Sequence, residues 1–176
     1  CREGLSLNRR CVDTSDNAHW EAAHRLLMNQ TVQAAVIEND ARTILRDGLA
    51  YDRCQVGVVT DMDGREALAE FDVQDQDQMY KVMRTQVDVV LPHGAAVLNA
   101  AEPQVLELAP LSDGVVVLYA QDGTLPAIAE HRAQDGGRAV FVKNGRVVLA
   151  TGSAEHVLAP LADLAFGRNA VQPGAD

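Results

Sequence analysis

The sequence predicts an α/β fold in which a mostly parallel sheet is flanked by helices and followed by an antiparallel β-hairpin. Apolar strand-like runs alternate with helical segments through most of the chain, which is typical of βαβ units. Residues 54–61 (CQVGVVTD) are largely apolar, as buried parallel strands are. Residues 138–150 contain two β-like runs joined by Asn144-Gly145, a strong signal for a type I′ hairpin turn.

The first helix is predicted over residues 20–29 (WEAAHRLLMN), after a polar start, residues 1–16, that contains one short β-like piece. Asp16 and Asn17 precede this helix, and both are good N-caps because their side-chain oxygens accept hydrogen bonds from first-turn amides. The residues that fall on one face at helical spacing are Trp20, Ala23 and Leu27.

A βαβ pattern is predicted next. Residues 34–38 (AAVIE) resemble a strand, residues 41–47 a short helix that Gly48 stops, and residues 54–61 a second, buried strand. The first strand of this βαβ pattern is therefore predicted at residues 34–38.

After an irregular acidic loop, the alternation continues. We predict a helix over residues 76–86, a strand over 95–99 (AAVLN), a helix opened by Pro103 and a strand over 114–120 (GVVVLYA). The tail, residues 165–176, is rich in Gly, Pro and polar residues and has no predicted element. Together these segments indicate a Rossmann-like sheet.

Composition excludes several classes of function. Fifteen Lys and Arg residues against twenty-five Asp and Glu residues give this 176-residue chain a net charge of −10, and the basic residues are scattered. Such a chain repels nucleic acid and anionic membranes, and its apolar runs are far shorter than the ~20 residues that span a bilayer. Three cysteines without CxxC spacing support neither a disulfide framework nor a zinc site. We expect a cytoplasmic protein of about one domain that binds neither nucleic acid nor membrane.

Three polar residues occur in a fixed order beside apolar runs: Glu38 after AAVI, Lys81 in QMYKVM and Asn99 at the end of AAVLN. The carboxyl ends of strands in an open parallel sheet meet at one crevice, so residues just past such strands converge there. This order suggests a nucleotide-dependent ligase.

Residues 34–63 and 78–103 resemble the central, ATP-binding domain of the Mur ligase superfamily, most closely the Mur-like half of cyanophycin synthetases. The most specific piece is ILR-GLAYD-C-VGVV, and a weaker likeness runs from Gly137 to Gly152. The resemblance implies that ATP phosphorylates a carboxylate and that an amine attacks the acyl phosphate. In the cyanophycin synthetase type, arginine is added to aspartate side chains of a poly-aspartate backbone.

The resemblance also implies roles for single residues. Glu38 matches a magnesium-binding glutamate, Lys81 a catalytic lysine that is carbamylated to bind a second Mg²⁺, and Asn99 the asparagine that hydrogen-bonds adenine. Each has a simpler alternative: Glu38 as a solvated acid at a helix start, Lys81 as a surface lysine, and Asn99 as a turn residue that ends a strand.

The chain also departs from the family pattern. A metal-binding histidine is usual after the third strand, but here the loop contains Asp61 and Asp63, with Glu66 near the histidine's place. A carboxylate still suits Mg²⁺, so Glu66 is a third metal candidate. The chain contains no GxxGKT/S phosphate loop and no C-terminal substrate domain. We expect residues 1–176 to be a partial ATP-binding domain that is inactive alone.

The expected partners are ATP with Mg²⁺, arginine or another amino acid, and a carboxylate acceptor polymer, and we expect the intact protein to form a homo-oligomer. Two alternatives stay open. One is a degenerate Mur-like scaffold without catalysis, and the other is a Rossmann-like domain that binds a different small molecule.

Overall fold

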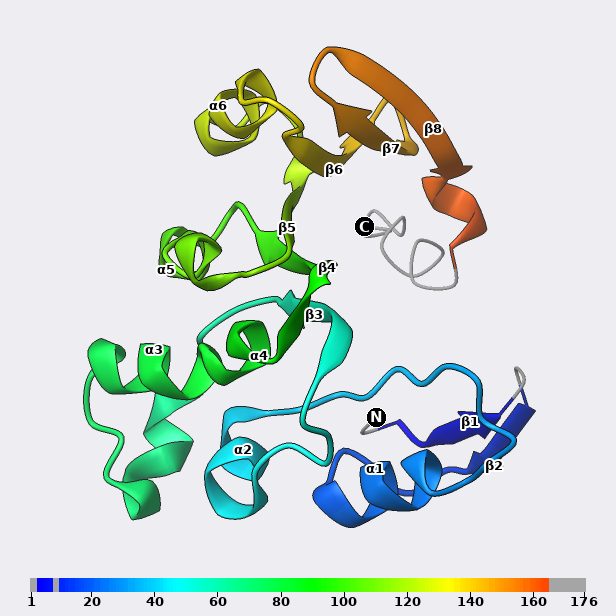
Figure 1. Cartoon of the computed structure of the whole chain (residues 1–176), viewed down its shortest axis with the longest axis vertical. Helices are drawn as coiled ribbons and strands as arrows, with labels where there is room; N and C mark the ends of the chain where they lie inside the picture. Colours follow the sequence, from blue (N-terminus) through cyan, green and yellow to red (C-terminus); the bar gives the residue numbers. More distant parts are fainter. Residues whose placement is uncertain (1–2, 8–9, 165–176) are drawn as a thin grey trace, which may run out of the picture. The chain divides into compact units, whose positions relative to one another are not determined.

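The computed structural model describes residues 3–7 and 10–164, so the predicted features of the tail lie outside the described residues. The chain forms two compact units, and the elements of both are drawn in Figure 1. The N-terminal unit comprises the residues up to Cys54 and Met62–Thr85, and the sheet unit comprises Gln55–Asp61 and the residues from Gln86 onward. No helix in the described ranges is long and apolar enough to cross a membrane.

The N-terminal unit begins with a short antiparallel pair, β1 (Leu5–Leu7) and β2 (Arg10–Asp13), followed by helix α1 (Trp20–Leu27). The sequence prediction of one β-like piece covers only part of this pair, whereas the predicted helix is confirmed. Its buried face is centred on Ala22 and Ala23, while Leu27 is exposed. The predicted apolar face is therefore only partly correct.

The predicted caps of α1 are wrong. His19 is the N-cap, and its Nδ1 accepts a hydrogen bond of 3.3 Å from the amide of Ala22. Asp16 instead accepts from the amide of Ala18 at 2.8 Å, in the turn before the helix. Asn17 is buried and donates to the carbonyl of Ser15. Both residues stabilise the approach to the helix rather than its first turn.

The prediction of a strand at residues 34–38 is also wrong. These residues form neither a helix nor a strand, and neither sheet of the described chain includes them. Val36, at the centre of the run, is 98% exposed. A strand needs a neighbour that satisfies its backbone amides and carbonyls, and apolar composition alone does not supply one.

Helix α2 (Ala41–Asp47) has the predicted boundaries. Asp40 is its N-cap and accepts a hydrogen bond of 2.7 Å from the amide of Thr43. The helix ends at Gly48, whose φ of 77° is a conformation that glycine adopts without a Cβ penalty. Local signals at both ends are therefore sufficient to define this helix.

A 3₁₀ segment, η1 (Arg65–Phe71), occupies part of the acidic loop that the sequence predicts to be irregular. An ion pair between Arg42 and Glu70 connects it to α2. The predicted helix over residues 76–86 is present as α3 (Gln76–Met83), with the short helix α4 (Thr85–Asp88) directly after it.

The sheet unit contains a six-stranded sheet in the order β3-β4-β5-β6-β7-β8. Its strands are β3 (Cys54–Val59), β4 (Val90–Asn99), β5 (Val115–Asp122), β6 (Arg138–Lys143), β7 (Arg146–Thr151) and β8 (Ala154–Pro160). The pairs β4/β5 and β5/β6 are parallel, and β6/β7 and β7/β8 are antiparallel. Gly94 lies against the Gln55 carbonyl and Asn99 against that of Thr60, so β3 and β4 also run in the same direction. The predicted mostly parallel sheet and hairpin are confirmed.

Helices α5 (Pro103–Leu106) and α6 (Pro126–Ala133) lie on one side of this sheet (Figure 1). Short 3₁₀ segments, η2 (Ala109–Leu111) and η3 (Leu161–Asp163), follow α5 and β8. The core between helices and sheet contains Leu98, Val105, Leu108, Leu118, Ile128, Ala139 and Ala150, each at most 4% exposed. Burial of each large aliphatic side chain contributes about 1.5–3 kcal/mol. The sequence prediction omits α6 and β8, although Pro126 at the first turn of α6 is a helix-start signal.

Strand β3 is less buried than its composition predicts. Val56 and Val58 are 57% and 50% exposed, and their side chains project from the same face of β3, the first strand of the sheet. On the other face, a Cβ at Gly57 would collide with the Gln86 carbonyl and the Val90 side chain. Glycine therefore permits α4 to approach the strand closely.

Candidate functional site at the strand ends

Five polar residues lie where β3 and β4 end or beside that point, and we call them the strand-exit cluster: Thr60, Asp61, Asn99, Glu102 and Tyr119. Thr60 and Asp61 follow β3, Asn99 ends β4, and Tyr119 lies beside Asn99 on β5. Ligands of open α/β sheets bind at the carboxyl ends of the strands. This cluster is therefore the candidate site of the sheet unit.

Asn99 holds two chain segments together at this edge. Its Nδ2 donates a hydrogen bond of 2.9 Å to the Thr60 carbonyl, and its Oδ1 accepts one of 3.0 Å from the Ala101 amide. A primary amide has two N–H donors and two oxygen lone pairs, so one of each remains for a ligand. Its geometry fits the turn-residue alternative and is also compatible with reading an adenine edge.

Tyr119 is the register partner of Asn99 on the neighbouring parallel strand. Its carbonyl accepts a short hydrogen bond of 2.7 Å from the Ala100 amide, which fixes the exit of β4 against β5. The side chain is half-buried. Burial raises the pKa of its phenol above the ordinary value, and the charges of Asp61 and Glu102 raise this pKa further. Tyr119 therefore remains a neutral donor at physiological pH.

The two carboxylates of the cluster are exposed. The Thr60 hydroxyl donates to Asp61 at 2.8 Å, and Glu102 occupies the N-cap position of α5 without a side-chain bond to the helix amides. Their negative charge disfavours a bare anion at this edge. A neutral, flat, hydrogen-bonding group such as a nucleobase suits the cluster better.

Glu38, Glu66 and Lys81 all belong to the N-terminal unit, and all three are exposed. Glu38 precedes the cap of α2, Glu66 lies in the first turn of η1, and Lys81 lies in the last turn of α3. Within the described ranges, no group of three or more His, Cys, Asp or Glu side chains could hold a metal ion. The structure therefore places these residues without assembling a protein-only metal cage.

The chemistry of these donors nevertheless suits magnesium in part. Glu38 and Glu66 supply the hard oxygen atoms that Mg²⁺ prefers, and this ion is usually bound by one or two carboxylates together with water and phosphate oxygens. Lys81 is a cation and becomes an oxygen donor only if its amine is carbamylated. The metal-binding roles of Glu38, Glu66 and Lys81 remain predictions.

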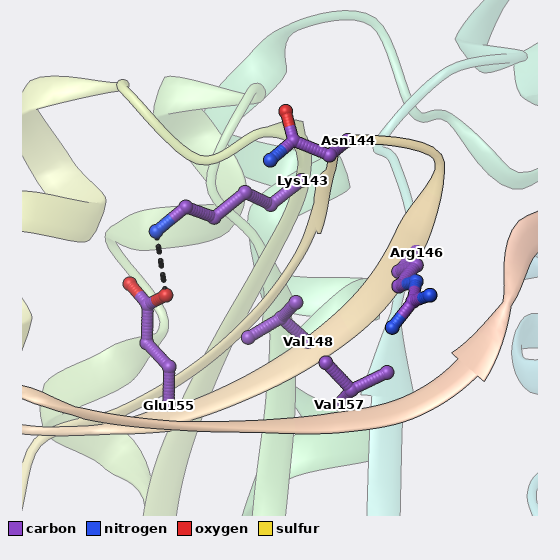
Figure 2. A pocket seen from close by; sticks show the side chains of 6 residues that line it. All are labelled: Lys143, Asn144, Arg146, Val148, Glu155 and Val157. Carbon is purple, nitrogen blue, oxygen red and sulfur yellow. Dashed lines mark hydrogen bonds and ion pairs between the residues drawn. The ribbon is translucent and has the colours of Figure 1, made fainter.

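A separate hollow of about 500 Å³ lies on the hairpin extension, and Figure 2 shows the side chains that line it. Lys143 points toward Glu155, and their ion pair measures 2.6 Å. Glu155 is also bonded to Arg132 at 3.3 Å, and the Arg132 guanidinium lies 5.4 Å from the Phe141 ring centre. None of the predicted site residues lines this hollow. The ion pairs of Glu155 with Lys143 and Arg132 hold β8 against β6 and α6.

Sequence reasoning missed Tyr119 as a site residue. Its run, GVVVLYA, predicts a strand, but the sequence does not reveal that the tyrosine is in register with Asn99. The signal that could have indicated Tyr119 is its residue type: a tyrosine near the end of an apolar run combines an aromatic ring with a polar hydroxyl group.

No family model matches the chain. Curated proteins do match it: the cyanophycin synthetase of Synechocystis sp. is 35% identical over 151 residues, which is 86% of this chain and 17% of that protein. The cyanophycin synthetase of Crocosphaera subtropica is 33% identical over 85% of this chain. The chain is related to cyanophycin synthetase. It spans about a sixth of the length of these synthetases, so the similarity concerns one segment of them.

A third cyanophycin synthetase, from Geminocystis herdmanii, is 34% identical over 81% of the chain. The resemblance to cyanophycin synthetases that residues 34–63 and 78–103 indicate is thus confirmed. These synthetases are similar to both units, because the matched length exceeds that of either unit.

Proposed function

We propose that this chain is a segment of an ATP-dependent ligase of the Mur type that forms an amide bond. The observation that carries the proposal is its similarity to cyanophycin synthetases over 86% of its length. The parallel sheet with Asn99 at a strand end supports it, since nucleotides bind at this edge of such sheets. In the proposed reaction, ATP phosphorylates a carboxylate, and an amine displaces the phosphate to give an amide, ADP and phosphate.

Asn99 is proposed to hydrogen-bond the adenine. Its free N–H and free lone pair form the complementary donor and acceptor that an adenine edge requires. The bonds to Thr60 and Ala101 fix the rotamer of the amide before the ligand arrives. Less side-chain entropy is then lost on binding.

Magnesium would be held by Glu38, with Glu66 in place of the usual histidine and with Lys81 after carbamylation. Bound Mg²⁺ would neutralise charge on the phosphates, which otherwise repel a carboxylate. Unmodified Lys81 would place a positive charge on the exposed side of α3. The chain contains no GxxGKT/S loop, so we propose that another part of a longer protein supplies the triphosphate clamp.

The proposed substrates are those that the resemblance to cyanophycin synthetases implies: arginine as the amine, and a poly-aspartate chain as the carboxylate acceptor. The test uses the complete protein that carries this segment. We expect saturable, Mg²⁺-dependent ATP binding and arginine-dependent release of ADP. Asn99→Ala should weaken ATP binding about tenfold, since loss of one or two hydrogen bonds costs about 1–2 kcal/mol.

Asn29→Ala is the matched control, because Asn29 is an exposed asparagine in a turn of the N-terminal unit. A folded protein with no affinity for ATP would contradict the proposal. That outcome would favour the second candidate, a non-catalytic scaffold, for which Glu66 near the place of the usual metal-binding histidine is the supporting observation. Nucleotide binding without arginine-dependent ADP release would instead indicate a different amine substrate or a different small-molecule function.

A further inference from the structure

The proposed function gives no role to the ring of Tyr119, the one aromatic residue of the strand-exit cluster. Asn99 and Tyr119 are partners in parallel register, so their side chains project from the same face of the sheet. Neighbouring strands lie about 4.8 Å apart. A flat group that is hydrogen-bonded to Asn99 therefore lies within reach of the tyrosine ring.

The next position in the same row is apolar. Val140 on β6 is the register partner of Tyr119, and both side chains are half-buried. The row thus changes from an amide to an aromatic ring to an aliphatic side chain. Ligand sites commonly combine an apolar wall with a few fixed polar groups in this way.

The surrounding charge restricts what can lie against this ring. Asp61 and Glu102 are close enough to raise the pKa of the Tyr119 phenol. Their field disfavours a phosphate at this spot, whereas an uncharged base or its ribose is tolerated. The ring has an aromatic face and also a hydroxyl donor.

We propose that Tyr119 stacks against the base of the nucleoside whose edge Asn99 reads. This inference rests on the proposed function and assigns the base-binding contact to this chain. The two residues then have different roles. Asn99 distinguishes adenine from other bases, and Tyr119 contributes affinity that does not depend on the base, because every base has a π-face.

The experiment uses the full chain of residues 1–176 with adenosine and guanosine as probes, since neither carries a phosphate. Tyr119→Leu should weaken the binding of both nucleosides by about tenfold, because base stacking on an aromatic ring contributes about 1–3 kcal/mol. Tyr119→Phe keeps the ring and should bind within about twofold of the wild type. Asn99→Ala should instead reduce the preference for adenosine over guanosine.

A second readout separates stacking from a merely structural role. The chain has three tyrosines, and ¹³C labelling of their rings gives signals that the Tyr119→Phe variant assigns. Adenosine should shift the ring signals of Tyr119 and leave those of Tyr51 and Tyr80 in place. Unmoved Tyr119 signals at saturating adenosine, with Asn99→Ala still weakening binding, would overturn the stacking role and leave the proposed function intact. Absence of nucleoside binding by the folded wild-type chain would overturn the base site itself.

Discussion

The side-chain amide of Asn99 donates a 2.9 Å hydrogen bond to the backbone carbonyl of Thr60, 39 positions earlier in the chain. This bond ties the exit of β3 to the last residue of β4. The Asn99 oxygen also accepts from Ala101 and so shapes the turn toward α5. The residue with the proposed adenine role is therefore also a structural brace, and its two functions need separate measurements.

Asn99→Ala should reduce the free energy of unfolding by about 1–2 kcal/mol, since each of its two neutral hydrogen bonds contributes about 1 kcal/mol. Urea denaturation of the full chain measures this change. Asn99→Asp keeps the acceptor for Ala101 but loses the donor to Thr60, so it should destabilise the chain as well. Unchanged stability in both variants would show that the bond to Thr60 contributes nothing to the fold.

Gly57→Ala should destabilise the chain by about 1–3 kcal/mol, the usual cost of forcing an extra methyl group into a packed site. The added Cβ would meet the backbone carbonyl of Gln86, which cannot move as a flexible side chain does. The control is Val56→Thr, a β-branched exchange on the exposed face of the same strand. Equal midpoints of denaturation for the two variants would contradict the close approach of α4.

Local signals predicted the elements that depend on few neighbours. Asp40 and Gly48 define α2, and Asn144 with Gly145 defines the hairpin, because a cap or a tight turn is encoded within a few residues. The prediction of a strand at residues 34–38 was wrong, because the pairing of a strand depends on a neighbouring strand elsewhere in the chain. The exposure of β3 was also unpredictable, since composition does not reveal that a strand lies at an edge of the sheet.

The candidate site also combines features that the local sequence predicts with features that depend on distant parts of the chain. The place of Asn99 at a strand end follows from AAVLN, but its partnership with Tyr119 is a matter of register between β4 and β5. Register is set by the whole sheet rather than by either run. The three residues of the N-terminal unit, Glu38, Glu66 and Lys81, were placed on the basis of resemblance, and their roles remain predictions.

Asp75→Ala should destabilise α3, the helix that carries Lys81, by about 1 kcal/mol. Asp75 accepts from the Gln78 amide at 2.8 Å, and the Gln78 side chain accepts in return from the Asp75 amide at 3.2 Å, which is a capping box. Gln78→Ala leaves the Asp75 carboxylate as cap but removes two bonds to the Gln78 oxygen, the one from the Asp75 amide and one of 2.6 Å from the Gln74 amide, so it should destabilise α3 as well. Thermal denaturation followed by circular dichroism measures both effects, and an unchanged stability of Asp75→Ala would contradict the capping role.

The ion pairs of Glu155 should make stability depend on pH in the acid range. The hydrogen bond and charge of Lys143, with a contribution from Arg132, lower the pKa of Glu155 below its ordinary value of 4.5. The carboxylate therefore stabilises the fold fully above pH 4.5, and this contribution is lost as the pH falls through the lower folded-state pKa. Glu155→Gln should show a smaller drop in melting temperature between pH 6 and about pH 3.

Glu130→Gln is the matched control for that series, because Glu130 is an exposed acid on α6. Its pH profile should follow that of the wild type. A profile of Glu155→Gln that also follows the wild type would show that the contacts with Lys143 and Arg132 are too weakly populated to matter in solution.

The ionisation of Tyr119 provides a test of the electrostatics at the strand ends. Its pKa lies above the ordinary value of 10.0, because burial and the negative charges of Asp61 and Glu102 disfavour the phenolate. The unfolded chain loses this proton at a lower pH than the folded chain does, so stability should fall as the pH rises above 10. Ultraviolet titration of the phenolate, with the titration of the Tyr119→Phe variant subtracted, isolates this group.

Asp61→Asn with Glu102→Gln should lower the pKa of Tyr119 but leave it above 10, since burial is the larger cause. An unchanged titration in that double variant would mean that the two carboxylates do not face the ring, and a phosphate would then no longer be disfavoured beside it.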